Sequence, residues 1–420
     1  MEAMRKAILV GVRIDDEVES FEHSMEELAN LAAACDIKGV GQVTQTLERV
    51  NPSHYIGKGK AMEVKELAAA EEAEIVLFND ELSPSQIRNL EADLDCMVID
   101  RTMLILDIFA ERAKTREAQL QVEIAELQYQ LPRLVGLRES LGRQGGGAGL
   151  KNRGAGETKL ELDRRRIEEK ITVLSKQLEE LVAQRQVQRK QRHKQALPSA
   201  ALVGYTNAGK STLMNAMMEV FEPAKIKQVF EKDMLFATLE TSVRSITLPD
   251  NKSLLLTDTV GFVSKLPHHL VKAFRSTLEE VAEADLLIHV VDCSNPHYKE
   301  MMEITERTLA EIGVKDIPIL YAYNKADRLE MSIPKVVEEG VYLSARQRIG
   351  IKELTASIRE RLYRDYVSCE LIIPYQHGEI VSYFNERANV LETVYEEEGT
   401  RLVLECRASD RDKYKEYLVN

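Results

Sequence analysis

The sequence predicts an α/β protein built from four consecutive parts. We expect an N-terminal α/β domain over 1–103, a long antiparallel helical hairpin over 104–196, a domain with a mainly parallel sheet over 197–365, and a small α+β domain over 366–420. Three observations predict this arrangement. Strands alternate with helices in the first and third parts, apolar residues repeat at three- and four-residue steps in the second, and a glycine-rich phosphate-loop motif begins at Gly204.

Composition indicates a folded protein with several hydrophobic cores. The chain has 420 residues, of which 44% are apolar, too many for a disordered tail. No apolar run approaches the length that crosses a bilayer, and the N-terminus runs directly into a strand, so we expect neither a membrane span nor a signal peptide. The cysteines lack C-x-x-C spacing, which favours reduced thiols in a cytoplasmic protein over a zinc site; they are Cys35, Cys96, Cys293, Cys369 and Cys406. We expect a monomer.

Charge is distributed unevenly along the chain. The formal net charge of −13 argues, by itself, against a nucleic-acid partner. Between residues 132 and 196, however, sixteen Lys/Arg stand against eight Asp/Glu, a net charge of +8. The hairpin is therefore a candidate for RNA contact.

The first part alternates strand and helix, the pattern of a mostly parallel sheet. Ser83 before Pro84, with Gln86 at the third helical position, predicts a helix that starts with a capping box. The other expected elements are strands over 7–12, about 39–47, 74–78 and 96–100, and helices over 21–34 and about 61–72.

A second glycine-rich stretch, residues 57–60, reads Gly-Lys-Gly-Lys. Glycine lets backbone amides approach a phosphate of a nucleotide or of RNA, and lysine adds charge. The stretch has neither a Ser/Thr metal ligand nor the longer phosphate-loop spacing. We therefore favour a solvated basic turn.

Two apolar seams predict the helical hairpin. Apolar residues recur every three or four positions, as in a coiled coil. We expect Pro132 to interrupt the first helix and the capping box Thr158–Glu161 to start the second. Two such helices joined by a loop form an antiparallel hairpin on the order of 40 Å long. The seams are Leu120, Ile124, Leu127 and Leu131 in the first helix, and Ile167, Ile171, Leu174, Leu178 and Leu181 in the second.

The loop between these helices, 141–156, contains seven glycines interleaved with Arg143, Lys151 and Arg153. Each glycine costs conformational entropy on ordering, so stability does not explain them. A flexible linker is one interpretation, although linkers usually combine glycine with serine. The other is a basic tip that inserts into RNA, which we favour because backbone phosphates attract such a tip.

The third part begins with a phosphate-binding loop. An apolar run precedes a G-x-x-x-x-G-K-S motif, and a segment with helical propensity follows it. Backbone N–H groups of such a loop and the helix N-terminus suit phosphate oxygens. We expect Lys210 to contact the β- and γ-phosphates and Ser211 to bind Mg²⁺. The predicted loop consists of Gly204, Tyr205, Thr206, Asn207, Ala208, Gly209, Lys210 and Ser211.

Two further segments complete the phosphate side of this site. Asp258 ends an apolar run and can hold Mg²⁺ through water, while the Gly261 amide contacts the γ-phosphate; the motif reads Asp258, Thr259, Val260, Gly261. We expect Thr238 to close on Mg²⁺, although other threonines lie nearby. Its switch segment is Phe236, Ala237, Thr238, Leu239 and Glu240. The expected catalytic residues are thus Lys210, Thr238 and Gly261, and the metal ligands Ser211, Thr238 and Asp258.

An N-K-x-D motif predicts which base is bound. The Asp327 carboxylate can accept hydrogen bonds from N1–H and the 2-amino group of guanine, and adenine has neither donor. Ser344 opens a segment that would support the base from the other side. The motifs are Asn324, Lys325, Ala326 and Asp327, and then Ser344, Ala345 and Arg346. In this order they predict a P-loop GTPase domain that binds GTP and GDP; an ATP-using kinase would not explain N-K-x-D.

Phe262 and Asn207 distinguish this domain from signalling GTPases. Phe262 follows Gly261, where a glutamine usually positions the attacking water, so we expect slow intrinsic hydrolysis. Asn207 is a candidate ligand for a monovalent cation such as K⁺ beside the phosphates.

The last part is predicted to be a small, acidic α+β domain. Strands are expected near 369–374, 390–395 and 402–406, with a helix between the first two and a turn at 397–399. Six Lys/Arg stand against eleven Asp/Glu over 366–420, which favours a protein contact.

These segments together resemble the HflX family of ribosome-associated GTPases over nearly the whole chain. The resemblance rests on the glycine-rich loop with its continuation Arg153–Arg166, the phosphate loop, Asp258–Phe262 and the switch Phe236–Leu239. The glycine-rich loop joined to this phosphate loop is specific, whereas the nucleotide motifs alone indicate only a GTPase. One departure is Leu239–Ser242, Leu-Glu-Thr-Ser where the family more often has Leu-Asp-Pro-Thr, which affects the detailed switch conformation.

The resemblance implies GTP-dependent binding to the large (50S) ribosomal subunit, with the N-terminal part and the hairpin reaching its rRNA. It also implies dissociation or rescue of idle or stalled ribosomes, often under stress, with hydrolysis stimulated by the ribosome. Family members are also reported to use ATP, for which 57–60 would be the place to look.

Two hypotheses of function follow. The leading one is a GTPase that acts on ribosomes, and the alternative is a GTP-controlled protein-interaction switch whose hairpin recruits a protein without contacting RNA. Salt separates them, because phosphate contacts weaken steeply with salt and protein docking does so less. A third class, an RNA-modifying enzyme, lacks a candidate catalytic Cys, His or metal cluster outside the GTPase domain.

Overall fold

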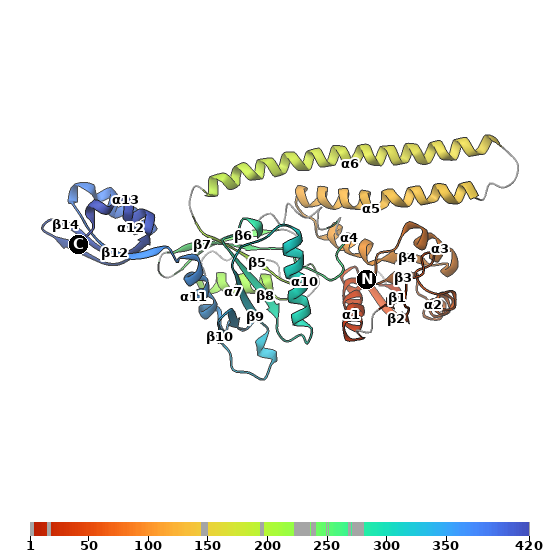
Figure 1. The fold of residues 1–420 in the computed structure, drawn as a ribbon, viewed down its shortest axis with the longest axis horizontal. Coiled ribbons are helices and arrows are strands. Elements are labelled where there is room, and N and C mark those ends of the chain that lie inside the picture. Colours follow the sequence, from red (N-terminus) through yellow and green to blue (C-terminus); the bar gives the residue numbers. More distant parts are fainter. Residues whose placement is uncertain are drawn as a thin grey trace.

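Three sheets and a pair of long helices make up the protein (Figure 1). The computed structural model describes every residue except 1–3, 15–17, 144–149, 194–196, 222–235, 237–240, 249, 251, 268–269, 271–280 and 420. For residues 18–19, 134–143, 150–160 and 185–193 it describes the backbone alone.

The N-terminal domain contains a four-stranded parallel sheet with the order β2-β1-β3-β4, as the alternation of strands and helices predicts. Side chains of β1 alternate between two buried clusters, so that Leu9 packs under α1 and α4 and Val10 under α2 and α3. The Ser83 capping box is confirmed. The elements are β1 (Arg5–Arg13), α1 (Val18–Ala34), β2 (Ile37–Thr46), α2 (Lys58–Glu71), β3 (Ile75–Phe78), α3 (Pro84–Leu94), β4 (Met97–Asp100) and α4 (Arg101–Arg112).

The stretch predicted as a basic turn, 57–60, instead begins a helix. Gly57 has the extended conformation of an N-cap, and α2 starts at Lys58. The Gly57 N–H donates to the Gln45 side chain (2.9 Å), which fixes the chain just before the helix.

The predicted hairpin is formed by α5 (Arg116–Arg143) and α6 (Leu150–His193), which run side by side (Figure 1). Its seam residues pack together; they are Leu120, Ile124, Leu127, Ile171, Leu174, Leu178 and Leu181. The chain is not helical between α4 and α5, which begins at Arg116. There the Thr115 hydroxyl accepts a hydrogen bond from the Ala118 N–H (3.2 Å) and caps α5.

Two expectations about the hairpin are wrong. Pro132 lies inside α5 and does not end it, because Tyr129 and Arg133 on either side are both held by Asp100. Thr158 lies within α6, which already begins at Leu150, since extending a formed helix adds one hydrogen bond per residue. Residues 144–149, the centre of the predicted glycine-rich tip, lie outside the described residues.

The P-loop domain contains a seven-stranded sheet with the order β10-β11-β9-β8-β5-β7-β6. Its five central strands are parallel, as predicted, and the edge strands β6 and β10 are antiparallel. The carboxyl ends of the parallel strands therefore meet along one edge, where α/β proteins bind ligands. The elements are β5 (Ser199–Val203), α7 (Lys210–Phe221), β6 (Ser242–Thr247), β7 (Ser253–Asp258), β8 (Leu286–Asp292), α10 (Tyr298–Glu311), β9 (Ile319–Asn324), β10 (Lys335–Val337), β11 (Gly340–Tyr342) and α11 (Ile351–Leu362).

The C-terminal domain is a three-stranded antiparallel sheet covered by helices. Its strands are β12 (Tyr366–Ile373), β13 (Asn389–Glu396) and β14 (Gly399–Arg407), in the order β12-β14-β13. Helix α12 (Gly378–Arg387) was predicted, and the final helix α13 (Ala408–Lys413) was not.

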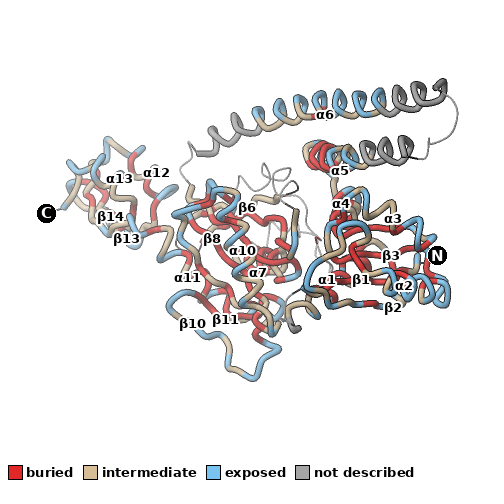
Figure 2. The backbone as a smooth tube through the Cα atoms, turned by 45° about the vertical axis from the view of Figure 1, so that its right-hand side comes forward, coloured by how far each residue is buried: buried red, intermediate tan, exposed pale blue. Residues whose placement is uncertain are grey.

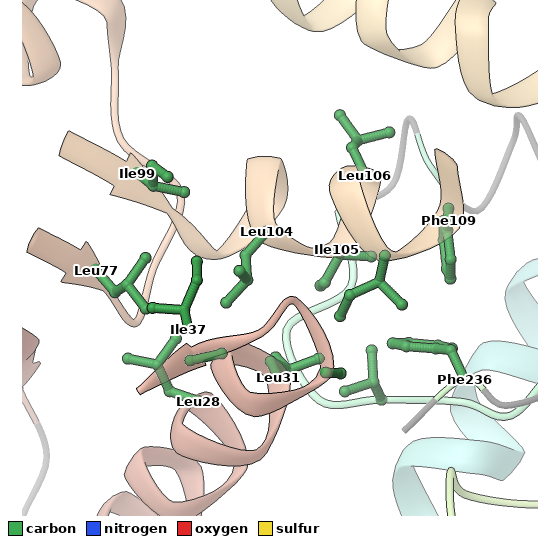
Figure 3. Packing of buried hydrophobic residues seen from close by; sticks show 14 of the residues in the cluster. Leu28, Leu31, Ile37, Leu77, Ile99, Leu104, Ile105, Leu106, Phe109 and Phe236 are labelled. Carbon is green, nitrogen blue, oxygen red and sulfur yellow. The ribbon is translucent and has the colours of Figure 1, made fainter. Parts of the chain in front are cut away.

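Buried residues concentrate in the sheets and in the helices against them, whereas much of the described part of α6 is exposed (Figure 2). One hydrophobic cluster joins the N-terminal domain to the P-loop domain (Figure 3). In it, the ring of Phe109 from α4 meets the ring of Phe236 edge to face, with centroids 4.7 Å apart. Among the helices that the structure describes, none is long and apolar enough to span a membrane.

Candidate nucleotide site

The phosphate loop lies between the carboxyl end of β5 and the first residue of α7. Gly209 has φ +94°, and a Cβ there would lie 2.3 Å from the Asn324 amide nitrogen, so this position requires glycine. The loop residue Asn207 is exposed and also has a positive φ, +59°. The sequence thus places a glycine-containing turn at the start of a helix, the arrangement that binds phosphate.

Lys210 is buried within this loop. Its ammonium group donates to the carbonyl oxygens of Gly204 (3.1 Å) and Tyr205 (2.9 Å). Burial lowers the pKa of Lys210 to about 8, and the nearby Asp258 carboxylate opposes that shift. A Cβ on Gly261 would lie 2.9 Å from the ammonium nitrogen; glycine therefore lets the β7 motif approach the loop closely.

The predicted metal ligands Ser211 and Asp258 are brought together. The Ser211 hydroxyl donates to Asp258 Oδ2 (2.6 Å), and Asp258 is fully buried. The other oxygen, Oδ1, is buried without a hydrogen-bond partner among the described residues. Burial raises the pKa of Asp258, opposed by the Ser211 hydrogen bond and Lys210. A buried carboxylate with one unpaired oxygen beside a hydroxyl fits a hard cation such as Mg²⁺.

Of the predicted switch segment, Phe236 lies among the described residues. Phe236 is buried against the N-terminal domain. Thr238, the expected metal ligand, lies outside the described residues, as do Ala237, Leu239 and Glu240. Within the β7 motif, the Thr259 hydroxyl donates to the Leu202 carbonyl (2.6 Å), which fixes this motif against β5.

Asn324 connects the phosphate loop to the two predicted guanine segments. Its side-chain amide donates to the Ala208 carbonyl (2.9 Å) and accepts from the Ala345 N–H (3.0 Å). Ser344 is fully buried, whereas Arg346 is exposed. Asp327 is exposed, in the short 3-10 helix Ala326–Arg328, so its carboxylate is accessible to a base.

Asp292 and Cys293 support this site and were not predicted. Asp292, at the end of β8, forms an ion pair with Lys325 (2.8 Å). The Cys293 thiol donates to the Asn324 carbonyl (3.0 Å). Their position at the carboxyl end of a buried parallel strand could have predicted this role, because ligand-binding residues gather at such strand ends.

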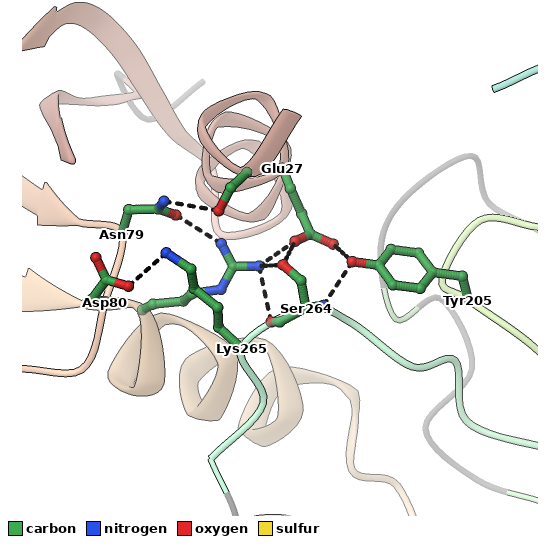
Figure 4. Close-up of polar contacts among 8 residues, drawn as sticks. Glu27, Asn79, Asp80, Tyr205, Ser264 and Lys265 are labelled. Carbon is green, nitrogen blue, oxygen red and sulfur yellow. Dashed lines mark hydrogen bonds and ion pairs between the residues drawn. The ribbon is translucent and has the colours of Figure 1, made fainter. Parts of the chain in front are cut away.

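A polar cluster links the phosphate loop to the N-terminal domain (Figure 4). The Tyr205 hydroxyl donates to Glu27 (2.5 Å) and accepts from the Ser264 N–H (2.6 Å). Arg101 donates to Glu27, to the Ser264 hydroxyl (2.9 Å) and to Asn79 (2.9 Å). We call Glu27, Arg101, Tyr205 and Ser264 the interdomain cluster. No local sequence signal marks it, since it joins residues distant along the chain.

A cavity of about 110 Å³ lies behind the loop, with α1 and β8 in its wall. His23, Thr206 and His289 line it. His289 is buried, and this burial, with a smaller effect of Lys210, lowers its pKa to about 3. The imidazole is therefore neutral at neutral pH.

Three protein families match consecutive parts of the chain. They are described as "GTP-binding GTPase N-terminal" over residues 22–110, "GTP-binding GTPase Middle Region" over 112–192 and "50S ribosome-binding GTPase" over 199–325. Together these matches extend from α1 to Lys325, the second residue of the N-K-x-D motif.

Individual relatives match over most of their length. "GTPase HflX" of Caldanaerobacter subterraneus subsp. tengcongensis is 42% identical, over 99% of this chain and 94% of the relative. "GTPase HflX" of Escherichia coli is 39% identical, over 95% and 92%. Among solved structures, a GTP-binding protein from Sulfolobus solfataricus in complex with GDP is 24% identical and covers 86% of this chain and 99% of its own, with a TM-score of 0.44.

Proposed function

The chain belongs to the HflX family of GTPases, and we propose that it binds the large (50S) ribosomal subunit and uses GTP to dissociate or rescue idle or stalled ribosomes. One observation carries this proposal: a long, basic helical arm is joined to a complete set of nucleotide motifs. The "50S ribosome-binding GTPase" match over 199–325 supports the same partner. The protein would act in the cytoplasm, as a monomer that contacts rRNA through its arm.

Within this proposal the phosphate side of the site binds GTP and Mg²⁺. The loop Gly204–Ser211 holds the phosphates through its amides, and Lys210 neutralises the β- and γ-phosphate charge. Ser211, Asp258 and Thr238 hold Mg²⁺, which when bound neutralises charge on the phosphate oxygens. The Gly261 amide contacts the γ-phosphate.

The base side selects guanine. The Asp327 carboxylate accepts from N1–H and the 2-amino group, and an adenine ring would leave that carboxylate unpaired. Asn324 positions both base segments through its two hydrogen bonds. Ser344, Ala345 and Arg346 border the opposite side of the base.

Phe262 explains why a partner would be needed for hydrolysis. Its side chain is buried in the hydrophobic cluster with Val203 and Leu287, so it cannot orient a water molecule. Its backbone instead pairs with the loop, because the Thr206 N–H donates to the Phe262 carbonyl (2.7 Å). We expect slow intrinsic hydrolysis that the ribosome stimulates, with K⁺ at Asn207 as an additional ligand of the phosphates.

The alternative, a GTP-controlled switch that recruits a protein through the arm, is favoured by the acidic C-terminal domain. The two functions differ in their salt dependence. RNA contacts predict a steep loss of affinity between low and physiological salt, and protein docking predicts a shallow one.

The decisive experiment measures GTP hydrolysis with and without purified large subunits. It compares the unaltered chain with a variant lacking residues 142–156, and with a second variant of full length in which Arg143, Lys151 and Arg153 become serine. Stimulation that both variants lose would support the proposal. Absence of stimulation in the unaltered chain, with GTP binding intact, would reject it in favour of the protein switch.

A further inference from the structure

The connection between β9 and β11 leaves one sheet face without a covering helix over these two strands, whereas α10 covers the neighbouring part of the same face. These neighbouring strands are parallel, and parallel neighbours are usually joined through a helix that covers the sheet. Residues 325–339, all described, contain instead a three-residue 3-10 helix and the short strand β10. Helix α11 packs on the other face, in the cluster with Leu320 and Val341.

Tyrosines line the uncovered face. Tyr321 and Tyr323 alternate along β9 with buried residues that pack under α11, and Tyr342 of β11 is the register partner of Tyr323. All three are half-buried. We call Tyr321, Tyr323 and Tyr342 the tyrosine face. Tyrosine is enriched at protein interfaces because it combines a large apolar ring with a polar edge.

The rings of the tyrosine face are stacked on one another. Centroids lie 5.9 Å apart between Tyr321 and Tyr323, and 4.5 Å apart between Tyr323 and Tyr342. His289 lies beside Tyr321 at one end (5.4 Å), and the Lys335 ammonium lies 6.0 Å from the Tyr342 centroid at the other. The ring faces are therefore already occupied, which disfavours a nucleobase, since bases stack on free aromatic faces.

Three acidic residues border the tyrosine face, against the single lysine Lys335 described above. The Tyr321 hydroxyl donates to Glu306 of α10 (2.8 Å). Glu338 and Glu339 form the exposed turn between β10 and β11. Burial, followed by Glu306 and Glu339, raises the pKa of Tyr321, so both carboxylates act on this ring. Such a rim attracts Lys and Arg side chains and repels phosphates.

We propose that the tyrosine face is a docking surface for a basic, extended segment of a protein partner, and that this partner is a protein of the large ribosomal subunit. The identity of the partner rests on the proposed function. Tyr323 directly precedes Asn324, and Tyr342 lies shortly before Ser344. The docked segment therefore lies against the two strands that carry the guanine-binding segments.

Photo-crosslinking from the full-length chain tests the proposal. The photoreactive amino acid p-benzoylphenylalanine replaces Tyr342 or, as a control, Tyr395, which is 75% exposed on β13. Each chain is irradiated with large subunits and a non-hydrolysable GTP analogue, and its sedimentation with the subunits is measured in the same sample. A crosslink from position 342 that protease removes and nuclease does not, absent from position 395, is expected.

The outcomes separate the two proposals. A crosslink that nuclease removes, or co-sedimentation without a protein crosslink, would overturn the docking surface and leave the proposed function standing. If the unaltered chain does not sediment with large subunits, both proposals fail.

Charge variants test the same surface without altering the tyrosines. Glu339→Lys is expected to weaken subunit binding about fivefold at low salt. The substitution replaces an ion pair between Glu339 and a basic residue of the docked segment by repulsion between two positive charges. Lys335→Glu is expected to strengthen subunit binding. Glu397→Lys makes the same charge change on the exposed C-terminal turn and should leave affinity unchanged. Equal affinity for all variants, or equal loss for both lysine substitutions, would contradict the proposal.

Discussion

Asp100 and Arg101 are adjacent in sequence, yet their buried side chains bind different parts of the molecule. Asp100 accepts a hydrogen bond from the Tyr129 hydroxyl of α5 (2.5 Å), and Arg101 donates to Glu27 and to Ser264 beyond the β7 motif. The first turn of α4 thus fixes the helical arm on one side and the nucleotide-binding domain on the other.

Replacing Arg101 with methionine should destabilise the protein strongly. Glu27 is buried and would lose its cation, and breaking a buried ion pair from one side costs about 3–5 kcal/mol. The free energy of unfolding in urea measures this. The double variant Glu27→Gln, Arg101→Met should lose clearly less than the sum of the single variants; additive losses would show that the two side chains are not coupled.

Tyr129→Phe should weaken the attachment of α5 to the N-terminal domain. It removes one hydrogen bond to the buried Asp100 carboxylate, which is worth about 1.5–3 kcal/mol. Thermal and urea unfolding provide the measurement. The matched change Tyr395→Phe, at an exposed tyrosine, should alter stability by less than about 0.5 kcal/mol, and a similar loss in both variants would contradict the assignment.

Asp327→Asn should exchange guanine for xanthine selectivity. The asparagine amide no longer offers two acceptors to N1–H and the 2-amino group, so GDP affinity should fall about 100-fold. The carbonyl oxygen of asparagine still accepts from N1–H of xanthine, while its NH₂ donates to the C2 carbonyl. Competition between GDP and xanthosine diphosphate for the variant checks this; unchanged GDP preference would remove Asp327 from the base site.

His289 should make stability depend on pH below about 6.5. Burial lowers its pKa in the folded protein to about 3, below the ordinary histidine value of 6.5, so the unfolded chain binds a proton first and stability falls as pH drops. Between pH 6.5 and 5 the loss is at most about 2 kcal/mol. His289→Gln should flatten this part of the profile of melting temperature against pH. An identical slope in both proteins would show that other groups cause it.

Local rules explain what the sequence could predict. The phosphate loop lies between β5 and α7 because glycine, lysine and serine at fixed spacing determine a strand–turn–helix unit. The Ser83 capping box was found because it involves only residues 83–86. Lys210, Ser211, Asp258 and Gly261 were brought together because parallel strands end at one edge of the sheet.

The remaining features depend on contacts between distant parts of the chain. Pro132 was expected to end α5, but the contacts of Tyr129 and Arg133 with Asp100 outweigh the one lost backbone hydrogen bond. The interdomain cluster joins Glu27 to Ser264, and neither lies in a recognisable motif. The absence of a covering helix over β9 and β11 could not be predicted either, since the short connection between these strands does not indicate which face of the sheet lacks a helix.

The length of α5 increases the displacement that a small rotation produces at the end of the arm. With 28 residues, α5 extends about 42 Å at 1.5 Å per residue. Because Tyr129 and Arg133 bind Asp100, α5 would tilt together with the N-terminal domain, and a rotation of about 10° would move a point about 42 Å from the pivot by roughly 7 Å. A small rotation beside the nucleotide would thus displace the end of the arm by more than the length of one helical turn.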